Sequence, residues 1–216
     1  MSEDITLKII ILGASTVGKT SIFIRYFDDE FSHSTITTVG VDFKTKFFKF
    51  EGTKIRINFI DTAGQEKFKA ISQNYLKGTD GVIFVFDLTN RETLELVDFW
   101  AECMNKNTRE NIGKILFGNK KDKIKNREID FNEGKALGDK IGCPYYEGSA
   151  LTGENIDFIM NEIAKSSYIE WKKTEENSDT VRLPSVVLEQ KIKKKKSWGA
   201  SYGAGSTISV LNEMGD

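Results

Sequence analysis

The chain has 216 residues, and its 31 Lys and Arg against 32 Asp and Glu give a formal net charge of -1. That balance argues against a nucleic-acid-binding protein, which normally carries a basic excess. Two cysteines are too few for a disulfide framework and indicate a reducing compartment. No stretch approaches the ~20 apolar residues that span a bilayer, so the composition predicts a soluble, cytoplasmic, mainly globular protein.

Short apolar runs alternate with longer amphipathic segments over the first 171 residues. Strands are predicted at 7–12, 43–50, 54–60, 82–86, 115–117 and 144–146, and a turn around Gly52 makes the second and third a hairpin. Helices are predicted at 20–27, 92–107 and 132–141. A closing helix has one apolar face, formed by Ile156, Ile159, Met160 and Ile163. Strands alternating with helices predict an α/β fold with a doubly wound sheet.

Composition changes after Trp171. Residues 172–216 contain 8 Lys and Arg and 6 Asp and Glu, a formal charge of +2, with few periodic apolar positions. Lys191 and the run 193–196 are followed by a Gly/Ser-rich stretch at 197–206. The pattern predicts one folded domain at 1–171 and a disordered tail at 172–216. The basic run is open to three interpretations: a solvated segment, a patch for anionic membranes, or a nuclear address.

The first motif lies directly after the first predicted strand and opens the first helix. Residues 13–20 read GASTVGKT, which matches the phosphate-binding P-loop pattern G-x-x-x-x-G-K-[ST]. Backbone N–H groups of such a loop surround phosphates, and the helix N-terminus adds partial positive charge. Lys19 is expected to reach the β- and γ-phosphates, and the Thr20 hydroxyl to take a Mg²⁺ position.

A second motif, Asp-Thr-Ala-Gly, ends the second hairpin strand at residues 61–64. An acidic residue there can hold Mg²⁺ through water, and the Gly64 N–H can approach a γ-phosphate because no side chain intervenes. Gln65 follows immediately and is placed to orient an attacking water. The sequence therefore predicts Asp61 as a metal position and Gln65 as the catalytic residue.

A third motif, Asn-Lys-Lys-Asp, follows the strand at 115–117 and occupies residues 119–122. A carboxylate at Asp122 can accept from both N1–H and N2–H₂ of guanine. Adenine offers no such donor pair, so the carboxylate would be left unsatisfied against it. Ser149 and Ala150, after the last strand, are expected to add backbone contacts to the base. The motif therefore predicts a guanine reader.

With these motifs the sequence resembles the Ras superfamily of small GTPases, and within it the Rab family, over about residues 7–171. The Rab-like stretches are 39–43 (VGVDF), 68–72 (FKAIS), 75–78 (YLKG) and 85–89 (VFDLT). The resemblance implies a P-loop NTPase fold of the small-GTPase type, with a six-stranded, mostly parallel sheet, one antiparallel strand and five main helices.

The resemblance also implies roles for individual residues. Thr38 would reach Mg²⁺ and the γ-phosphate, Phe31 would stack on the guanine edge, and segments near 31–43 and 61–77 would be switches ordered by GTP. Phe43, Ile60 and Tyr75 match the hydrophobic triad that Rab effectors contact. Metal ligands would be Thr20, Thr38 and Asp61. The expected GTP/GDP contacts are Ser15, Thr16, Val17, Gly18, Lys19, Thr20, Ser21, Phe31, Thr38, Gly64, Asn119, Lys120, Asp122, Ser149, Ala150 and Leu151.

Four positions depart from the family pattern. Thr16 stands where most relatives have glycine or a small residue, Ile60 where Trp is usual, and Leu151 where the Ser-Ala-Lys motif has Lys. No cysteine follows Cys143, and Ser2 replaces the glycine that myristoylation needs. We therefore expect no lipid anchor and at most weak, electrostatic and transient contact with endomembranes.

The sequence thus predicts a monomeric guanine-nucleotide switch that slowly hydrolyses GTP with Mg²⁺ and acts in vesicle trafficking. Its partners would be an exchange factor, a GTPase-activating protein and effectors that bind the two switches, with no nucleic acid. Two alternatives stay open: a GTP-holding scaffold that hardly hydrolyses, which Thr16 favours, and a P-loop ATPase or nucleotide kinase, which Asp122 disfavours.

Overall fold

A computed structural model describes residues 5–31, 41–62 and 76–177. The predicted tail from 178 onward lies outside these residues. The strands are β1 (Ile5–Leu12), β2 (Val41–Phe50), β3 (Thr53–Thr62), β4 (Gly81–Asp87), β5 (Gly113–Asn119) and β6 (Tyr145–Glu147). The helices are α1 (Lys19–Asp28), α3 (Arg91–Asn107), α4 (Phe131–Ile141), α5 (Ile156–Asn177) and the short 3₁₀ helix η1 (Ile124–Asn126).

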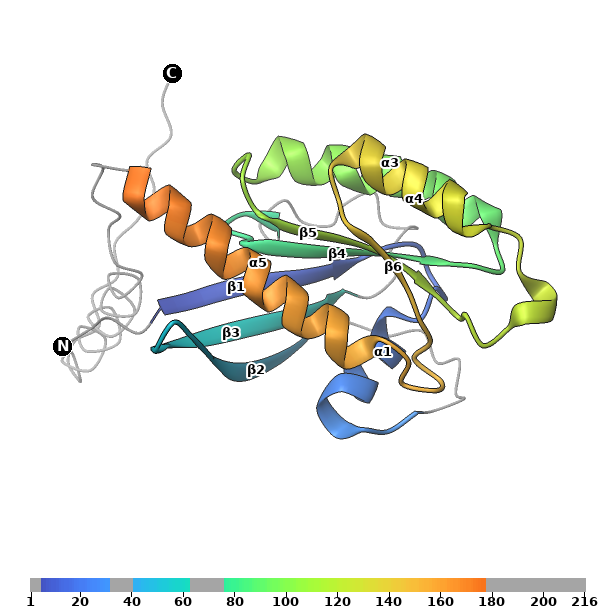
Figure 1. Ribbon diagram of the computed structural model, residues 1–216, viewed down its shortest axis with the longest axis horizontal. Coiled ribbons are helices and arrows are strands. Elements are labelled where there is room, and N and C mark those ends of the chain that lie inside the picture. The colour runs from blue at the N-terminus through green and yellow to red at the C-terminus, as the bar shows by residue number, and fades with distance from the viewer. Residues whose placement is uncertain (1–4, 32–40, 63–75, 178–216) are drawn as a thin grey trace, which may run out of the picture. The chain divides into compact units, whose positions relative to one another are not determined.

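The six strands form one sheet in the order β2-β3-β1-β4-β5-β6 (Figure 1). β2 runs antiparallel to β3, and every other neighbouring pair is parallel. The turn between β2 and β3 contains only Glu51 (φ 49) and Gly52 (φ 83). A two-residue hairpin turn of type I′ needs a positive φ at both residues. The predicted six-stranded, mostly parallel α/β sheet with one antiparallel strand is confirmed.

Alternating side chains of β1 supply two separate cores, because successive residues of a strand point to opposite faces. Leu7, Ile9 and Ile11 belong to the apolar cluster beneath α1 and α5. Ile10 and Leu12 belong to the cluster beneath α3 and α4. The parallel part of the sheet around β1 is therefore buried on both faces. No helix among the described segments is long and apolar enough to cross a membrane.

α5 continues to Asn177, so the predicted domain boundary at residue 171 falls inside this helix. Tertiary contacts near the β2–β3 turn support its last turns. Phe50 stacks on Tyr168 with ring centroids 5.5 Å apart, and Tyr168 stacks on Trp171 at 6.2 Å. Lys172 forms a 2.7 Å ion pair with Glu51 in the turn. Composition alone could not place the helix end, because these partners lie more than a hundred residues away.

Candidate functional site

The predicted site residues that the structure describes gather at one edge of the sheet, where parallel strands end. The P-loop follows β1, Asp61 lies near the end of β3, Asn119 ends β5, and Ser149 follows β6. This edge is where open α/β sheets place their ligand sites. The fold therefore brings the three motifs together, although they are separated by up to a hundred residues in sequence.

The P-loop packs too closely against the sheet for side chains at two glycines. A Cβ at Gly13 would lie 2.1 Å from the Val85 carbonyl oxygen, and one at Gly18 would lie 2.4 Å from Asn119 Nδ2. Both glycines have positive φ, 154 and 97. Gly18 caps the N-terminus of α1, so the partial positive charge of this helix faces the loop.

The Lys19 ammonium is buried and donates to two carbonyl oxygens of its own loop. The distances are 2.8 Å to Gly13 and 2.6 Å to Ala14. The loop therefore presents positive charge and helix N–H groups at one point, which suits phosphate oxygens. Ser15, in the loop, and Ser21, in the first turn of α1, flank it.

Asp61 and Thr20 form the part of the site that fits a divalent cation. The Thr20 hydroxyl donates to Asp61 Oδ2 at 2.7 Å. Asp61 is fully buried, and its Oδ1 has no hydrogen-bond partner within the described part of the chain. Burial raises the pKa of this carboxyl to about 6, although Thr20 and Lys19 oppose the rise. A buried carboxylate oxygen beside a hydroxyl matches the oxygen ligands of Mg²⁺, which binds through few protein groups.

Asn119 joins the P-loop to the loop after β6. Its Nδ2 donates to the Val17 carbonyl oxygen at 2.8 Å, and its Oδ1 accepts from the Ala150 N–H at 3.0 Å. Asn119 is 2% exposed and Val17 fully buried, so both bonds are shielded from water. This amide therefore fixes the position of the P-loop relative to the loop after β6.

Asp122 is oriented by Ser149. The buried Ser149 hydroxyl donates to Asp122 Oδ1 at 2.5 Å and accepts from the backbone N–H groups of Leu151 and Thr152 at 3.1 and 3.2 Å. Its single proton is thus committed to the carboxylate. Asp122 itself is half-buried, which leaves part of its carboxylate accessible to a base at this edge.

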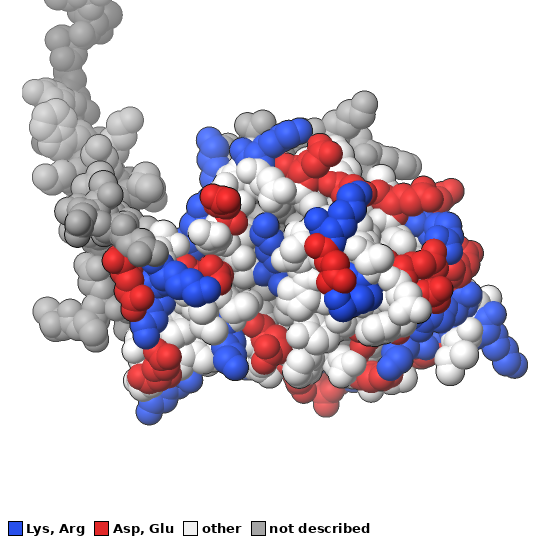
Figure 2. Space-filling model, turned by 45° about the horizontal axis from the view of Figure 1, so that its top comes forward, with Lys and Arg blue, Asp and Glu red and all other residues white. Residues whose placement is uncertain are grey.

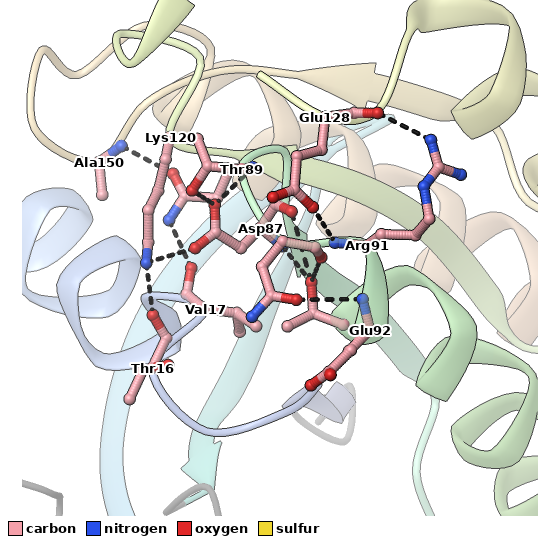
Figure 3. Close-up of polar contacts among 12 residues, drawn as sticks. Thr16, Val17, Asp87, Thr89, Arg91, Glu92, Lys120, Glu128 and Ala150 are labelled. Carbon is pink, nitrogen blue, oxygen red and sulfur yellow. Dashed lines mark hydrogen bonds and ion pairs between the residues drawn. The ribbon is translucent and has the colours of Figure 1, made fainter. Parts of the chain in front are cut away.

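Lys120 links the third motif to Thr16 of the P-loop and to Asp87 at the end of β4 (Figure 3). Its ammonium donates to the Thr16 carbonyl oxygen at 2.7 Å and lies 2.6 Å from Asp87 Oδ2. Sequence reasoning did not single out Asp87 as a site residue. The available signal was its position, because Asp87 ends a parallel strand as Asn119 does, and Asp61 is the last residue but one of β3.

The structure describes only some of the remaining predicted positions. Thr38, Gly64, Gln65 and Tyr75 lie outside the described residues. Phe31 is half-buried against the cluster beneath α1 and α5. Of the expected effector triad, Phe43 is 57% exposed. Ile60 is only 3% exposed, because it packs into the cluster beneath α3 and α4.

Comparison with known proteins decides the family. The protein-family model described as "Ras: Ras family" matches residues 8–169, a range that covers all three motifs. The chain is a Ras-family small GTPase. The sequence-based identification of the family and of the enzyme class is confirmed.

Relatives of this GTPase are of the Rab type. It is 37% identical to GTP-binding protein ypt2 of Schizosaccharomyces pombe over 164 residues, 76% of this chain and 82% of the relative. It is 31% identical to Ras-related protein SEC4 of Saccharomyces cerevisiae over 215 residues, 100% of this chain and 90% of the relative. It is 39% identical to Ras-related protein Rab-1A of Dictyostelium discoideum over 150 residues, 69% and 74% of the two chains.

Arg25 is a second residue of this GTPase that sequence reasoning missed. From α1 its Nε donates to the Ala150 carbonyl oxygen at 3.1 Å and its Nη2 to that of Leu151 at 3.0 Å. It therefore ties the loop after β6 to the helix that begins at the P-loop. No sequence signal pointed to this role, because the partners are 125 and 126 residues away.

The backbone of Thr16 allows a stability prediction for this GTPase. Thr16 has φ 63, which lies in the left-handed region. β-Branched residues rarely adopt this conformation, because it costs them about 1–2 kcal/mol. Because glycine adopts this φ without strain, we expect Thr16→Gly to raise the free energy of unfolding by about 1 kcal/mol. Urea denaturation at fixed GDP and Mg²⁺ concentrations measures it. As a control, Thr6→Gly in extended β1 should lower the same quantity, and a Thr16→Gly protein less stable than wild type would contradict the strain.

Proposed function

We propose that this GTPase is a Rab-like switch that binds and slowly hydrolyses GTP, and whose GTP state recruits effectors in vesicle trafficking. The observation that carries the proposal is the Asn119 bridge, because it joins the P-loop to the loop whose Ser149 orients Asp122, the proposed guanine reader. The name of the relative ypt2 includes GTP binding, and we propose the same ligand for this site.

In the proposed reaction, Lys19 and the N–H groups at the start of α1 bind the phosphates. Thr20 and Asp61, with Thr38, would hold Mg²⁺, which offsets phosphate charge when bound. Gln65 orients the attacking water, and Asp122 selects guanine with Ser149 behind it. GDP and phosphate are the products. Partner binding then depends on whether the γ-phosphate is present.

The role of Gln65 is tested by Gln65→Leu. We expect single-turnover GTP hydrolysis to slow by at least about tenfold, because a leucine cannot hydrogen-bond the water, while GTP affinity changes little. The reaction is followed as phosphate release from preloaded protein with Mg²⁺. Equal rates for wild type and variant would instead favour the second candidate, the GTP-holding scaffold, which the exposed Thr16 in the P-loop supports.

We further propose exchange factors, activating proteins and effectors as partners, with Phe43 as one exposed contact residue. Nucleic acid is not proposed. Figure 2 shows Lys and Arg interspersed with Asp and Glu over the face that it draws, whereas nucleic-acid binders concentrate basic residues on one face.

For localisation we propose a cytoplasmic protein that visits anionic membranes through Lys191 and the run 193–196. Each such lysine contributes about 1 kcal/mol at low salt, and screening reduces this strongly. Changing these five lysines to Gln should therefore abolish co-sedimentation with phosphatidylserine vesicles at low salt. Wild-type binding should fall at physiological salt. Binding that survives both changes would show that electrostatics do not account for membrane contact.

A further inference from the structure

We infer that Asp87 is a positioning residue for nucleotide retention, and that it acts through Lys120 on the P-loop. The inference rests on the proposed nucleotide site and adds to it a residue outside the three motifs. Among the described residues, the Asp87 carboxylate contacts Thr89 and Lys120, of which only Lys120 belongs to a motif (Figure 3). The charge of this carboxylate therefore reaches the P-loop through that one ammonium, whereas the Asp87 backbone pairs with Asn119 in the sheet.

Burial makes the contact between Asp87 and Lys120 a strong one. The side chains are 9% and 23% exposed, and the Asp87 Oδ2 to Lys120 Nζ distance is 2.6 Å. Exposed ion pairs contribute little, but removing one partner of a shielded pair leaves a charge without compensation. The Lys120 ammonium is thus held where it can also donate to the Thr16 carbonyl oxygen.

The backbone at both ends of that hydrogen bond is in the left-handed region. Thr16 has φ 63 and Lys120 has φ 66, and neither is glycine. Such residues keep this conformation only when their surroundings hold it. The Lys120–Thr16 hydrogen bond joins the two strained positions, and Asp87 fixes the lysine that makes it. Loss of the Asp87 charge should therefore loosen the phosphate loop and the base motif together.

Hydrogen bonds to Thr89 and Thr93 hold Asp87 in place, independently of Lys120. Its Oδ1 accepts from the Thr89 N–H at 2.9 Å and from the Thr89 hydroxyl at 2.7 Å. Its own backbone N–H donates to the Thr93 hydroxyl, in the first turn of α3, at 2.9 Å. The carboxylate therefore does not swing with Lys120. The chain of contacts runs from α3 through Asp87 and Lys120 to Thr16.

The test is the rate at which the preloaded full-length protein releases a fluorescent GDP analogue into excess GDP. We expect Asp87→Asn to speed release about tenfold, since a shielded charged hydrogen bond is weakened. Asp80→Asn is the matched control. Asp80 directly precedes β4, whereas Asp87 ends it, so the two carboxylates lie at opposite ends of this strand; Asp80 is 13% exposed and pairs with Arg109 at 2.9 Å. It should lower stability in urea without changing the release rate.

A double-mutant cycle separates positioning from general loosening. Lys120→Met alone should speed release, and adding Asp87→Asn to it should change the rate by less than about twofold, because the lysine through which Asp87 acts is gone. An equal Asp87→Asn effect in both backgrounds, or faster release from Asp80→Asn, would overturn the inference. A wild type that retains no GDP would contradict the proposed nucleotide site itself, whereas slow release unchanged by Asp87→Asn contradicts only the role of Asp87.

Discussion

Replacing Asp122 with Asn is expected to reverse base selectivity, from GTP over XTP to XTP over GTP. The Ser149 hydroxyl donates to Asp122 Oδ1 and has no second proton. An Asn side chain keeps that bond only if its carbonyl oxygen faces Ser149, which turns its NH₂ group toward the base. This amide can donate to the 2-oxo group of xanthine but opposes the N2–H₂ donor of guanine.

We expect GTP affinity to fall by about 100-fold, because the guanine loses one carboxylate acceptor and its N2–H₂ donor then faces the NH₂ donor of the Asn side chain. Competition binding with both nucleotides measures the shift. Glu154→Gln is the matched control, because Glu154 pairs with the adjacent Lys121 at 2.5 Å on the surface and should leave selectivity unchanged. Retained preference for GTP in Asp122→Asn would show that another group reads the base.

Replacing Thr20 with Asn is expected to weaken GTP binding more than GDP binding, by at least about tenfold. The Thr20 hydroxyl is 2.7 Å from Asp61 Oδ2, and the two oxygens form the described part of the proposed Mg²⁺ site. The substitution replaces this hydroxyl with a bulkier amide group. The loss is larger for GTP because the metal offsets the charge of the γ-phosphate that GDP lacks.

Dissociation rates of both nucleotides, with Mg²⁺ and with a chelator, measure the effect. In wild type, metal removal should speed release, and in Thr20→Asn it should change release little. Thr45→Asn is a suitable control, since the Thr45 hydroxyl also bonds a side-chain oxygen, Asn58 Oδ1, at 2.8 Å, but on the β2–β3 hairpin. Unchanged Mg²⁺ dependence in Thr20→Asn would remove Thr20 from the metal site.

Apolar pattern predicted the existence and order of the strands, and it failed mainly at their ends. β5 begins at Gly113 and ends at Asn119, whereas only 115–117 was predicted. The added residues include Gly118, where a Cβ would lie 2.9 Å from Leu88 and 3.0 Å from the Tyr145 hydroxyl. Tertiary crowding selects glycine there, and crowding between distant residues leaves no local pattern to read.

The candidate site shows the same division. Gly18, Lys19, Asn119 and Asp122 could be found because phosphate and guanine chemistry fixes both residue type and spacing. Arg25 could not, because it binds backbone carbonyl groups that only the fold brings near. Asp87 could be noticed only by its place at the end of a strand, and that place did not reveal Lys120 as its partner. Residues whose chemistry fixes their type and spacing can be found in the sequence, whereas the residues that position them are found only once the fold is known.

The central claim is that this chain retains a guanine nucleotide, and the nucleotide carried by the purified protein tests it most directly. Protein prepared with Mg²⁺ and without added nucleotide is denatured, and the released small molecules are separated by chromatography and quantified against protein. We predict GDP or GTP at close to one mole per mole of protein, and a strongly reduced amount from Asp122→Asn. An adenine nucleotide at that stoichiometry, or no nucleotide under conditions in which the protein is folded, would contradict the account.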